Sequence, residues 1–123
     1  MLTIRKAQMD AMASEMAVGF EERMAAYLQG AFSAWCAGMG RAKLREFVRH
    51  GMRRAEEYGF QVELDAARYL LAMRELGMEF DESAEHGWAK VLLTKRMAAG
   101  AKMERLEDGV VYQREARRIR DGR

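Results

Sequence analysis

The sequence predicts an all-α protein, folded as a single compact bundle of about five helices with a long N-terminal helix. Three features of the composition support this fold class. The 123 residues include no proline, alanine and methionine supply about half of the apolar residues, and only ten residues are Val, Ile or Thr. Alanine and unbranched side chains lose little rotamer freedom in a helix, whereas β-branched side chains are restricted there. The composition therefore argues against a β-sandwich, a barrel or a wound α/β sheet.

The first periodic segment predicts a helix over residues 4–30. Its apolar residues recur mostly at steps of three and four, which places them on one face of a helix. Thr3 is the expected N-cap, because its hydroxyl can accept a hydrogen bond from an amide of the first turn. The apolar stripe comprises Ile4, Met9, Met12, Met16, Phe20, Met24, Tyr27, Leu28 and Phe32.

Two helices are expected after a glycine-rich connector over residues 30–40. The second helix is predicted over residues 41–58, with an apolar face and a charged face. The third is predicted over residues 63–76. Each is followed by a glycine, Gly59 or Gly77, which can adopt the left-handed conformation that ends a helix. The apolar face of the second helix holds Leu44, Phe47, Val48, Gly51, Met52 and Ala55, and the charged face holds Arg45, Arg49, Arg53 and Glu56.

An acidic connector and two more helices complete the predicted bundle. Asp81 is the expected cap of the fourth helix, and Gly100 is expected to break the helical pattern. A fifth helix is predicted over residues 101–117, with Gly109 weakening its middle. The inward residues of these two helices are expected to be Trp88, Val91, Leu92, Leu93, Met103, Leu106, Val110 and Ala116.

Residues 1–117 are predicted to form one domain, followed by a flexible basic tail over residues 118–123. The N-terminal ten residues lack the apolar core of a secretory signal, and no apolar run approaches the ~20 residues that span a bilayer. The lone Cys36 suits a reducing compartment. We therefore expect a cytoplasmic protein that does not engage a membrane.

The residues available for catalysis are few: two histidines, one cysteine and three serines. There is no phosphate-binding loop, no nucleophile elbow and no H-E-x-x-H zinc motif. The sequence therefore predicts a protein that is not an enzyme, with no cofactor, metal ion or small-molecule substrate. His50 is expected to be exposed, His86 to cap a helix or lie on the surface, and Cys36 to be a buried, inert thiol.

Two charged segments are the main polar features. Residues 41–54 carry six positive charges and one negative charge, whereas residues 75–85 carry five negative charges and no positive charge. The two segments could meet in space, within one chain or between copies. Docking of the basic segment onto an acidic protein or a nucleic acid is one interpretation, and a solvated outer face is the other. The basic residues are Arg41, Lys43, Arg45, Arg49, Arg53 and Arg54.

The methionines of the first helix also have two interpretations. Methionine fills irregular gaps in a core, and it also lines surfaces that accept varied partners. Met9, Met12 and Met16 are therefore candidate partner-binding residues together with the six basic residues. Homodimerisation through the first helix is a further alternative.

The order of short helical motifs resembles that of a group of small uncharacterised bacterial proteins encoded near phage-tail-like or type VI secretion genes. The resemblance covers about residues 1–110. It departs from the group near residues 33 and 84–87, where the group often carries proline and this chain has Ser33 and AEHG. The motifs are FEERMAAYL (20–28), LREFVRHGMRRAEEYGF (44–60), ARYLLAMRELGMEFD (67–81), WAKVLL (88–93) and KMERL (102–106).

The resemblance implies an accessory role and brings no catalytic residue with it. We therefore expect a helical protein-interaction module, an adaptor or co-chaperone linked to a type VI secretion system. One alternative is an immunity protein that inhibits a neighbouring toxin through the acidic segment. Another is a nucleic-acid-associated regulator that uses the basic helix, although the helix over residues 63–76 has too few polar side chains to read bases.

Overall fold

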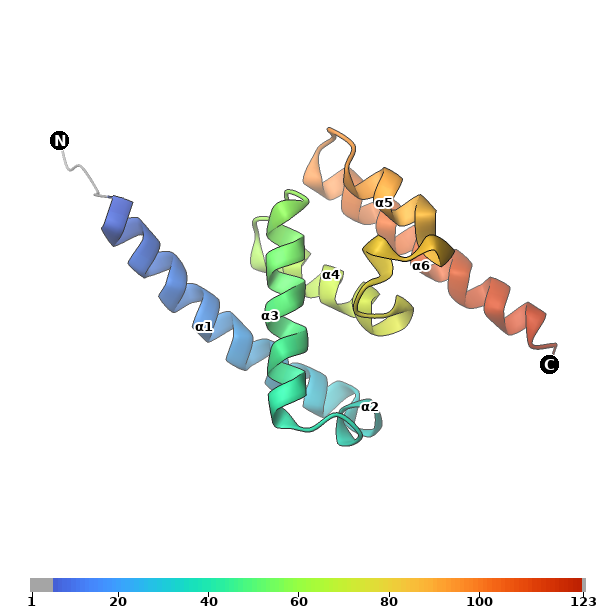
Figure 1. Cartoon of the computed structure of the whole chain (residues 1–123), viewed down its shortest axis with the longest axis horizontal. Coiled ribbons are helices and arrows are strands. Elements are labelled where there is room, and N and C mark those ends of the chain that lie inside the picture. Colours follow the sequence, from blue (N-terminus) through green and yellow to red (C-terminus); the bar gives the residue numbers. More distant parts are fainter. Residues whose placement is uncertain (1–5, 123) are drawn as a thin grey trace. The chain divides into compact units, whose positions relative to one another are not determined.

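The computed structural model describes residues 6–122, with side chains described from Gly19 onward. This part of the chain contains six α-helices, two short 3₁₀ helices and no strand, which confirms the all-α prediction. The elements are α1 (Lys6–Ala31), α2 (Ser33–Ala37), α3 (Arg41–Glu57), α4 (Glu63–Leu76), η1 (Phe80–Glu82), η2 (Ala84–His86), α5 (Gly87–Leu93) and α6 (Ala99–Arg120), as Figure 1 shows. Thr3, the expected cap of the first helix, lies outside the described residues.

The helix count differs from the expected five because the glycine-rich connector contains a short helix of its own, α2. Backbone hydrogen bonds run from the amide of Phe32 to the carbonyl of Leu28 and from the amide of Cys36 to the carbonyl of Phe32. The Trp35 ring lies edge-on to the Phe47 ring, with centroids 5.0 Å apart. Tertiary contact thus stabilises a five-residue helix that is too short to persist alone.

The chain divides into two compact units, Met1–Arg49 and His50–Arg123, with the boundary inside α3. Each unit is described by itself, and the single domain over residues 1–117 stays a prediction. In the first unit, Phe20, Met24 and Leu28 are buried at steps of four along α1. Tyr27, expected in the same stripe, is 53% exposed.

The second unit has a core centred on α4. Tyr69, a fully buried residue of that helix, lies with its ring 5.3 Å from Phe80 and 6.1 Å from both Tyr58 and Phe60, measured between centroids. Arg68 of α4 donates two hydrogen bonds to Glu107 of α6. The second unit is therefore held by an aromatic centre and by a charged contact between its two longest helices.

The ends of α3 and α4 follow the sequence closely. Gly59 and Gly77 have positive φ values of 92° and 114°, the left-handed region that glycine adopts without strain. The predicted range 63–76 agrees with α4, and the predicted range 41–58 ends one position beyond α3. Because these stops depend on local backbone geometry, periodicity and glycine position were enough to find them.

The predictions for α5 and α6 need four corrections. Gly100 does not break a helix, because it lies in the first turn of α6, where amides have no intrahelical partner. Val91 is 62% exposed, and Ala116 is exposed as well. The short α5 buries only one face, and the buried residues of α6 end at Val110. α6 continues to Arg120, so the first residues of the predicted tail are helical.

Gly109 permits a close contact inside the second unit. A Cβ atom built at this position would overlap Cζ3 and Cη2 of the Trp88 ring. The predicted weakness in the middle of α6 therefore has a packing role, since only a residue without a side chain lets the indole lie against the helix backbone.

Candidate interaction site

Three basic side chains of α3 lie on the surface of the first unit without an ion-pair partner among the described residues. Arg41, Lys43 and Arg45 are exposed. Within the described residues, none of the three takes part in an ion pair or a side-chain hydrogen bond. We call these three residues the basic surface. Arg41 and Arg45 are one helical turn apart and share a side of α3, and Lys43 lies on another side of the helix. Their charges are solvated rather than neutralised, so a partner could contact them without breaking an existing ion pair.

A hollow of about 240 Å³ lies beside the basic surface, between α1 and α3. Alanine side chains and Leu44 supply its apolar lining, and charged and amide side chains supply its polar lining. Its lining residues are Glu22, Ala25, Ala26 and Gln29 of α1 and Arg41, Leu44 and Arg45 of α3. An apolar centre with a polar rim is the usual anatomy of a protein interface.

Arg49, a predicted partner-binding residue, already has a partner inside the first unit. Its Nε atom donates to both carboxylate oxygens of Glu21, at 3.1 and 3.0 Å. The Glu21 side chain is only 12% exposed. The helix turns the Glu21 carboxylate toward Arg49 and away from solvent. Arg49 therefore links α3 to α1 within the first unit.

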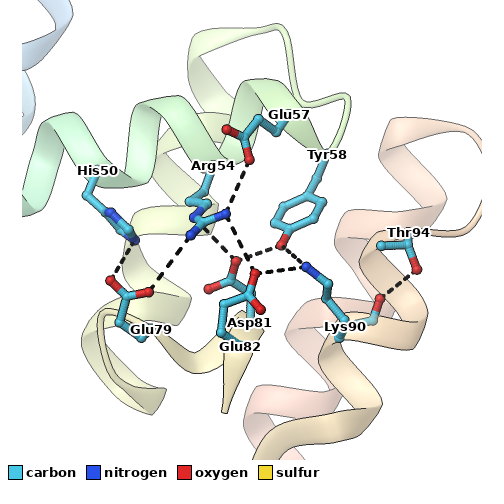
Figure 2. Close-up of polar contacts among 9 residues, drawn as sticks. All are labelled: His50, Arg54, Glu57, Tyr58, Glu79, Asp81, Glu82, Lys90 and Thr94. Atoms are coloured by element: carbon cyan, nitrogen blue, oxygen red, sulfur yellow. Dashed lines mark hydrogen bonds and ion pairs between the residues drawn. The ribbon is translucent and has the colours of Figure 1, made fainter.

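Arg54, another predicted partner-binding residue, belongs to a polar cluster in the second unit (Figure 2). Its Nε atom lies 3.5 Å from Oδ2 of Asp81, and its other nitrogens lie within 4.0 Å of Glu57, Glu79 and Glu82. The basic and acidic segments thus meet at this residue within one chain, which is one of the arrangements expected from the sequence. Arg54 is neutralised by several carboxylates.

Asp81 is the buried centre of this cluster. Its side chain is fully buried, and Oδ2 accepts a hydrogen bond of 2.6 Å from the Tyr58 hydroxyl. Lys90 donates to the same hydroxyl oxygen at 3.3 Å and to Glu82 at 2.9 Å. We call Arg54, Tyr58, Asp81, Glu82 and Lys90 the Asp81 cluster. Asp81 was expected to cap the fourth helix; instead it lies in η1 and joins α3 to the 3₁₀ segment.

The Asp81 cluster predicts a loss of stability at high pH. Burial, and then the hydrogen bond to Asp81, raise the pKa of Tyr58 from 10.0 to about 12. The Tyr58 hydroxyl therefore stays protonated in the folded state at pH values at which it is deprotonated in the unfolded state. Its contribution to stability is complete below pH 10 and disappears as the pH rises to about 12. We expect the free energy of unfolding to fall across this range, and to fall less in Tyr58→Phe.

Urea unfolding at a series of alkaline pH values measures this effect, with tyrosinate absorbance as a second reading. Tyr112→Phe is the matched control, because Tyr112 is 72% exposed and should leave the pH dependence unchanged. If the free energy of unfolding falls equally in wild type and in Tyr58→Phe, the pH dependence does not come from Tyr58.

Lys102 is a buried lysine that no sequence pattern indicated. Its Nζ atom donates to the carbonyl oxygens of Tyr58 and Leu93, each at 2.9 Å, and lies over the Phe60 ring. These carbonyls belong to the ends of α3 and α5, where backbone acceptors lack intrahelical donors and a positive charge is favoured. Lys102 therefore ties two helix C-termini to the start of α6.

Replacing Lys102 by methionine should destabilise the second unit by about 1.5–3 kcal/mol, the usual range for a hydrogen bond to a charged group. The methionine retains the length of the aliphatic chain but donates no hydrogen bond. Urea denaturation of the full chain gives the measurement, with the exposed Lys95→Met as control. Equal stability of the two variants would show that the two carbonyl contacts contribute little.

The histidine and cysteine predictions need correction. His50 is 9% exposed and lies 3.5 Å from Glu79, and His86 is 3% exposed. His86 stands at the N-cap position of α5 without making a side-chain cap hydrogen bond. Cys36 is half-buried rather than buried, and burial raises the pKa of its thiol, which disfavours the reactive thiolate. No metal-binding group of His, Cys, Asp or Glu occurs among the described residues.

The remaining predicted site residues are placed only in part. Arg53 is exposed. Met9, Met12 and Met16 lie in α1, but their side chains are outside the described part of the chain. The choice between core and partner-binding methionines therefore stays open. Charge patterning indicated the basic segment, but it could not find the Asp81 cluster or Lys102, because their contacts join residues far apart in the sequence.

Comparison with known proteins gives no further assignment. No family model, curated protein or solved structure matches the chain. The helices between residues 6 and 122 include none that is both long enough and apolar enough to cross a membrane.

Proposed function

We propose that this chain is a non-enzymatic interaction module that binds an acidic surface of a protein partner. The observation that carries this proposal is the basic surface formed by Arg41, Lys43 and Arg45. These side chains make no ion pair among the described residues, whereas Arg49 and Arg54 of the same helix are both neutralised.

The hollow beside the basic surface adds an apolar contribution. A partner side chain seated against Ala25, Ala26 and Leu44 would be removed from water while acidic groups around it face Arg41 and Arg45. Complementary charge raises the rate of encounter and selects the partner, and the apolar centre slows dissociation. The two features lie side by side on α1 and α3, so one partner could use both.

The titratable groups support binding over catalysis. The pKa of Tyr58 is raised to about 12 and that of Cys36 is raised as well, so both groups are poor nucleophiles near neutral pH. In the Asp81 cluster, each charged group already has a partner of opposite charge. A general acid or base needs an accessible position beside the substrate, and the Asp81 side chain is fully buried.

The cellular setting remains a proposal carried by the resemblance. An adaptor or co-chaperone linked to a type VI secretion system would act in the cytoplasm and bring a secretion component or effector to its site. The basic surface suits this role, because an adaptor binds its partner transiently and must be able to release it. Homodimerisation through the N-terminal helix stays an alternative, and it is compatible with this role only where it leaves Ala25 and Ala26 of α1 uncovered.

The alternatives have less support. An immunity protein would have to present its acidic segment to a toxin, but Glu79, Asp81 and Glu82 of this segment already contact Arg54. A helix-turn-helix regulator would need a free second helix, but α4 buries Tyr69, Leu70 and Met73. The geometry still allows one form of the nucleic-acid alternative, in which the basic surface binds phosphate groups.

Charge reversal of the basic surface tests the proposal. The full chain is recovered from its native host with its partners, and the identified partner is purified. We expect Arg41→Glu, Lys43→Glu and Arg45→Glu together to weaken partner binding at least tenfold, with the thermal melt nearly unchanged. The matched control reverses Lys95, Arg96 and Arg105, three exposed basic residues of the second unit, and should leave binding unchanged.

Two results would count against the proposal. One is equal loss of binding in the two triple variants, which would indicate a nonspecific effect of net charge. The other is retention of a nucleic acid instead of a protein, seen as a gel shift that disappears steeply with salt and is abolished by the same reversal.

A further inference from the structure

The hollow between α1 and α3 is lined by charges of both signs. Its lining residues on α1 follow the spacing i, i+3, i+4, i+7, and those on α3 follow i, i+3, i+4, so each set shares one face of its helix. Glu22 supplies a negative charge, and Arg41 and Arg45 supply positive charges. Binding of an acidic surface uses the two arginines and gives the carboxylate no role.

Glu22 is unpaired although it lines the same hollow as two arginines. The residue is exposed, and among the described residues it takes part in no ion pair and no side-chain hydrogen bond. The carboxylate that binds Arg49 is that of its chain neighbour, Glu21. Glu22 is therefore a solvated charge that would lose water when a partner enters the hollow.

The opposite charges lie toward opposite ends of the hollow. Gln29 and Arg41 stand near the connector that joins α1 to α3, so they mark one end. Glu22 lies two turns, about 10 Å, before Gln29 along α1. It is next to the residue that pairs with Arg49, which lies about two turns after Arg41 on α3. The hollow thus has a negative end and a positive end, with the alanines and Leu44 between them.

We infer that the hollow takes a mixed-charge segment of a protein partner, with a basic residue opposite Glu22, a carboxylate opposite Arg41 and an apolar side chain between them. A partner that covers Glu22 removes it from water, and a covered charge without a counter-charge costs free energy. A lysine or arginine at this position offsets that cost. The inference rests on the proposed function and deepens it, since it specifies the order of charges that the docking segment carries.

Shape and charge favour such a segment over other occupants. A nucleic acid presents phosphates alone and would set them against Glu22. A second copy of this chain offers both signs of charge, but a two-fold contact uses the same patch on both copies. Two hollows would then face each other and enclose a void instead of packing. The occupant must therefore protrude where the hollow recedes, and it must carry both signs of charge.

Photo-crosslinking at Ala26 of the full chain in its native host captures the protein that covers the hollow, because Ala26 is exposed and lines it. The crosslinked peptide identifies the docking segment, and the captured protein is then purified and titrated. We expect Glu22→Gln to weaken binding about fivefold or more, with an unchanged thermal melt. If the segment offered carboxylates alone, the same substitution would strengthen binding, because it removes a like charge.

Glu46→Gln is the matched control, since it removes one negative charge from an exposed position of α3 outside the hollow and should bind like wild type. A charge swap completes the test. Glu22→Lys and replacement of the segment's basic residue by glutamate should each weaken binding, and the two changes together should restore it.

Four outcomes would overturn the inference. The first is unchanged or stronger binding by Glu22→Gln, and the second is a crosslinked segment without a basic residue. The third is a dimer in sedimentation that Glu22→Gln dissociates, which assigns the hollow to a second copy. The fourth is the absence of a crosslinked protein at Ala26. The first two leave the proposed function intact, because triple reversal of the basic surface would still weaken partner binding, so failure of the inference is distinguishable from failure of the proposed function.

Discussion

Asp81→Ala should destabilise the second unit by about 3 kcal/mol, near the lower end of the range for breaking a buried charged contact. The substitution removes the acceptor of the Tyr58 hydroxyl and the buried partner of Arg54. The remaining Arg54 contacts limit the loss, because Glu57, Glu79 and Glu82 still surround its guanidinium. Urea denaturation of the full chain, followed by circular dichroism, measures this loss.

Glu82→Ala is the matched control for Asp81→Ala. Glu82 contacts Lys90 and Arg54, but its side chain is 47% exposed. Surface ion pairs contribute about 0–1 kcal/mol, so this variant should remain close to wild type. If the two variants lose equal stability, burial does not distinguish the two carboxylates, and Asp81 is not the centre of the cluster.

Phe47→Ala should destabilise the first unit by about 3–5 kcal/mol, the usual cost of truncating a buried phenylalanine. Phe47 is 4% exposed, and its ring contacts the edge of Trp35. Loss of the ring would leave a cavity and remove the contact that holds α2. The measurement is urea denaturation followed by tryptophan fluorescence, which also reports on the surroundings of Trp35.

Tyr27→Ala provides the comparison for Phe47→Ala in the same unit. It removes an aromatic ring of similar size that is 53% exposed, and we expect a loss of at most about 1 kcal/mol. The opposite ranking of the two variants would mean that the buried face of α3 has been assigned incorrectly.

Local patterns predicted much of the fold. The helices over 41–58 and 63–76 were found because each carries a periodic apolar face and ends at a glycine that adopts a positive φ. The short α2 was missed, because three glycines in one connector argue against a helix and its stability depends on Trp35 contacting Phe47. Helix boundaries that depend on tertiary contacts produce no periodic apolar pattern in the sequence.

Charge patterning predicted the candidate site less completely. The basic segment was evident from composition, and Arg41, Lys43 and Arg45 are exposed as expected for a docking surface. No local sequence feature distinguishes these three residues from Arg49, because the ion-pair partner of Arg49, Glu21, is 28 positions away in the sequence. Lys102 was missed for the same reason, since its acceptor at Tyr58 is 44 positions away.

Local features of the sequence were enough to predict a helical chain and the ends of α3 and α4. Rotamer freedom, apolar spacing and glycine stops act within a few residues, so they can be read along the chain. Folding determines which of the described charges are paired, and it makes Asp81 a buried acceptor rather than a helix cap. Pairing and burial depend on residues that folding brings together from distant positions, and no spacing rule contains that information.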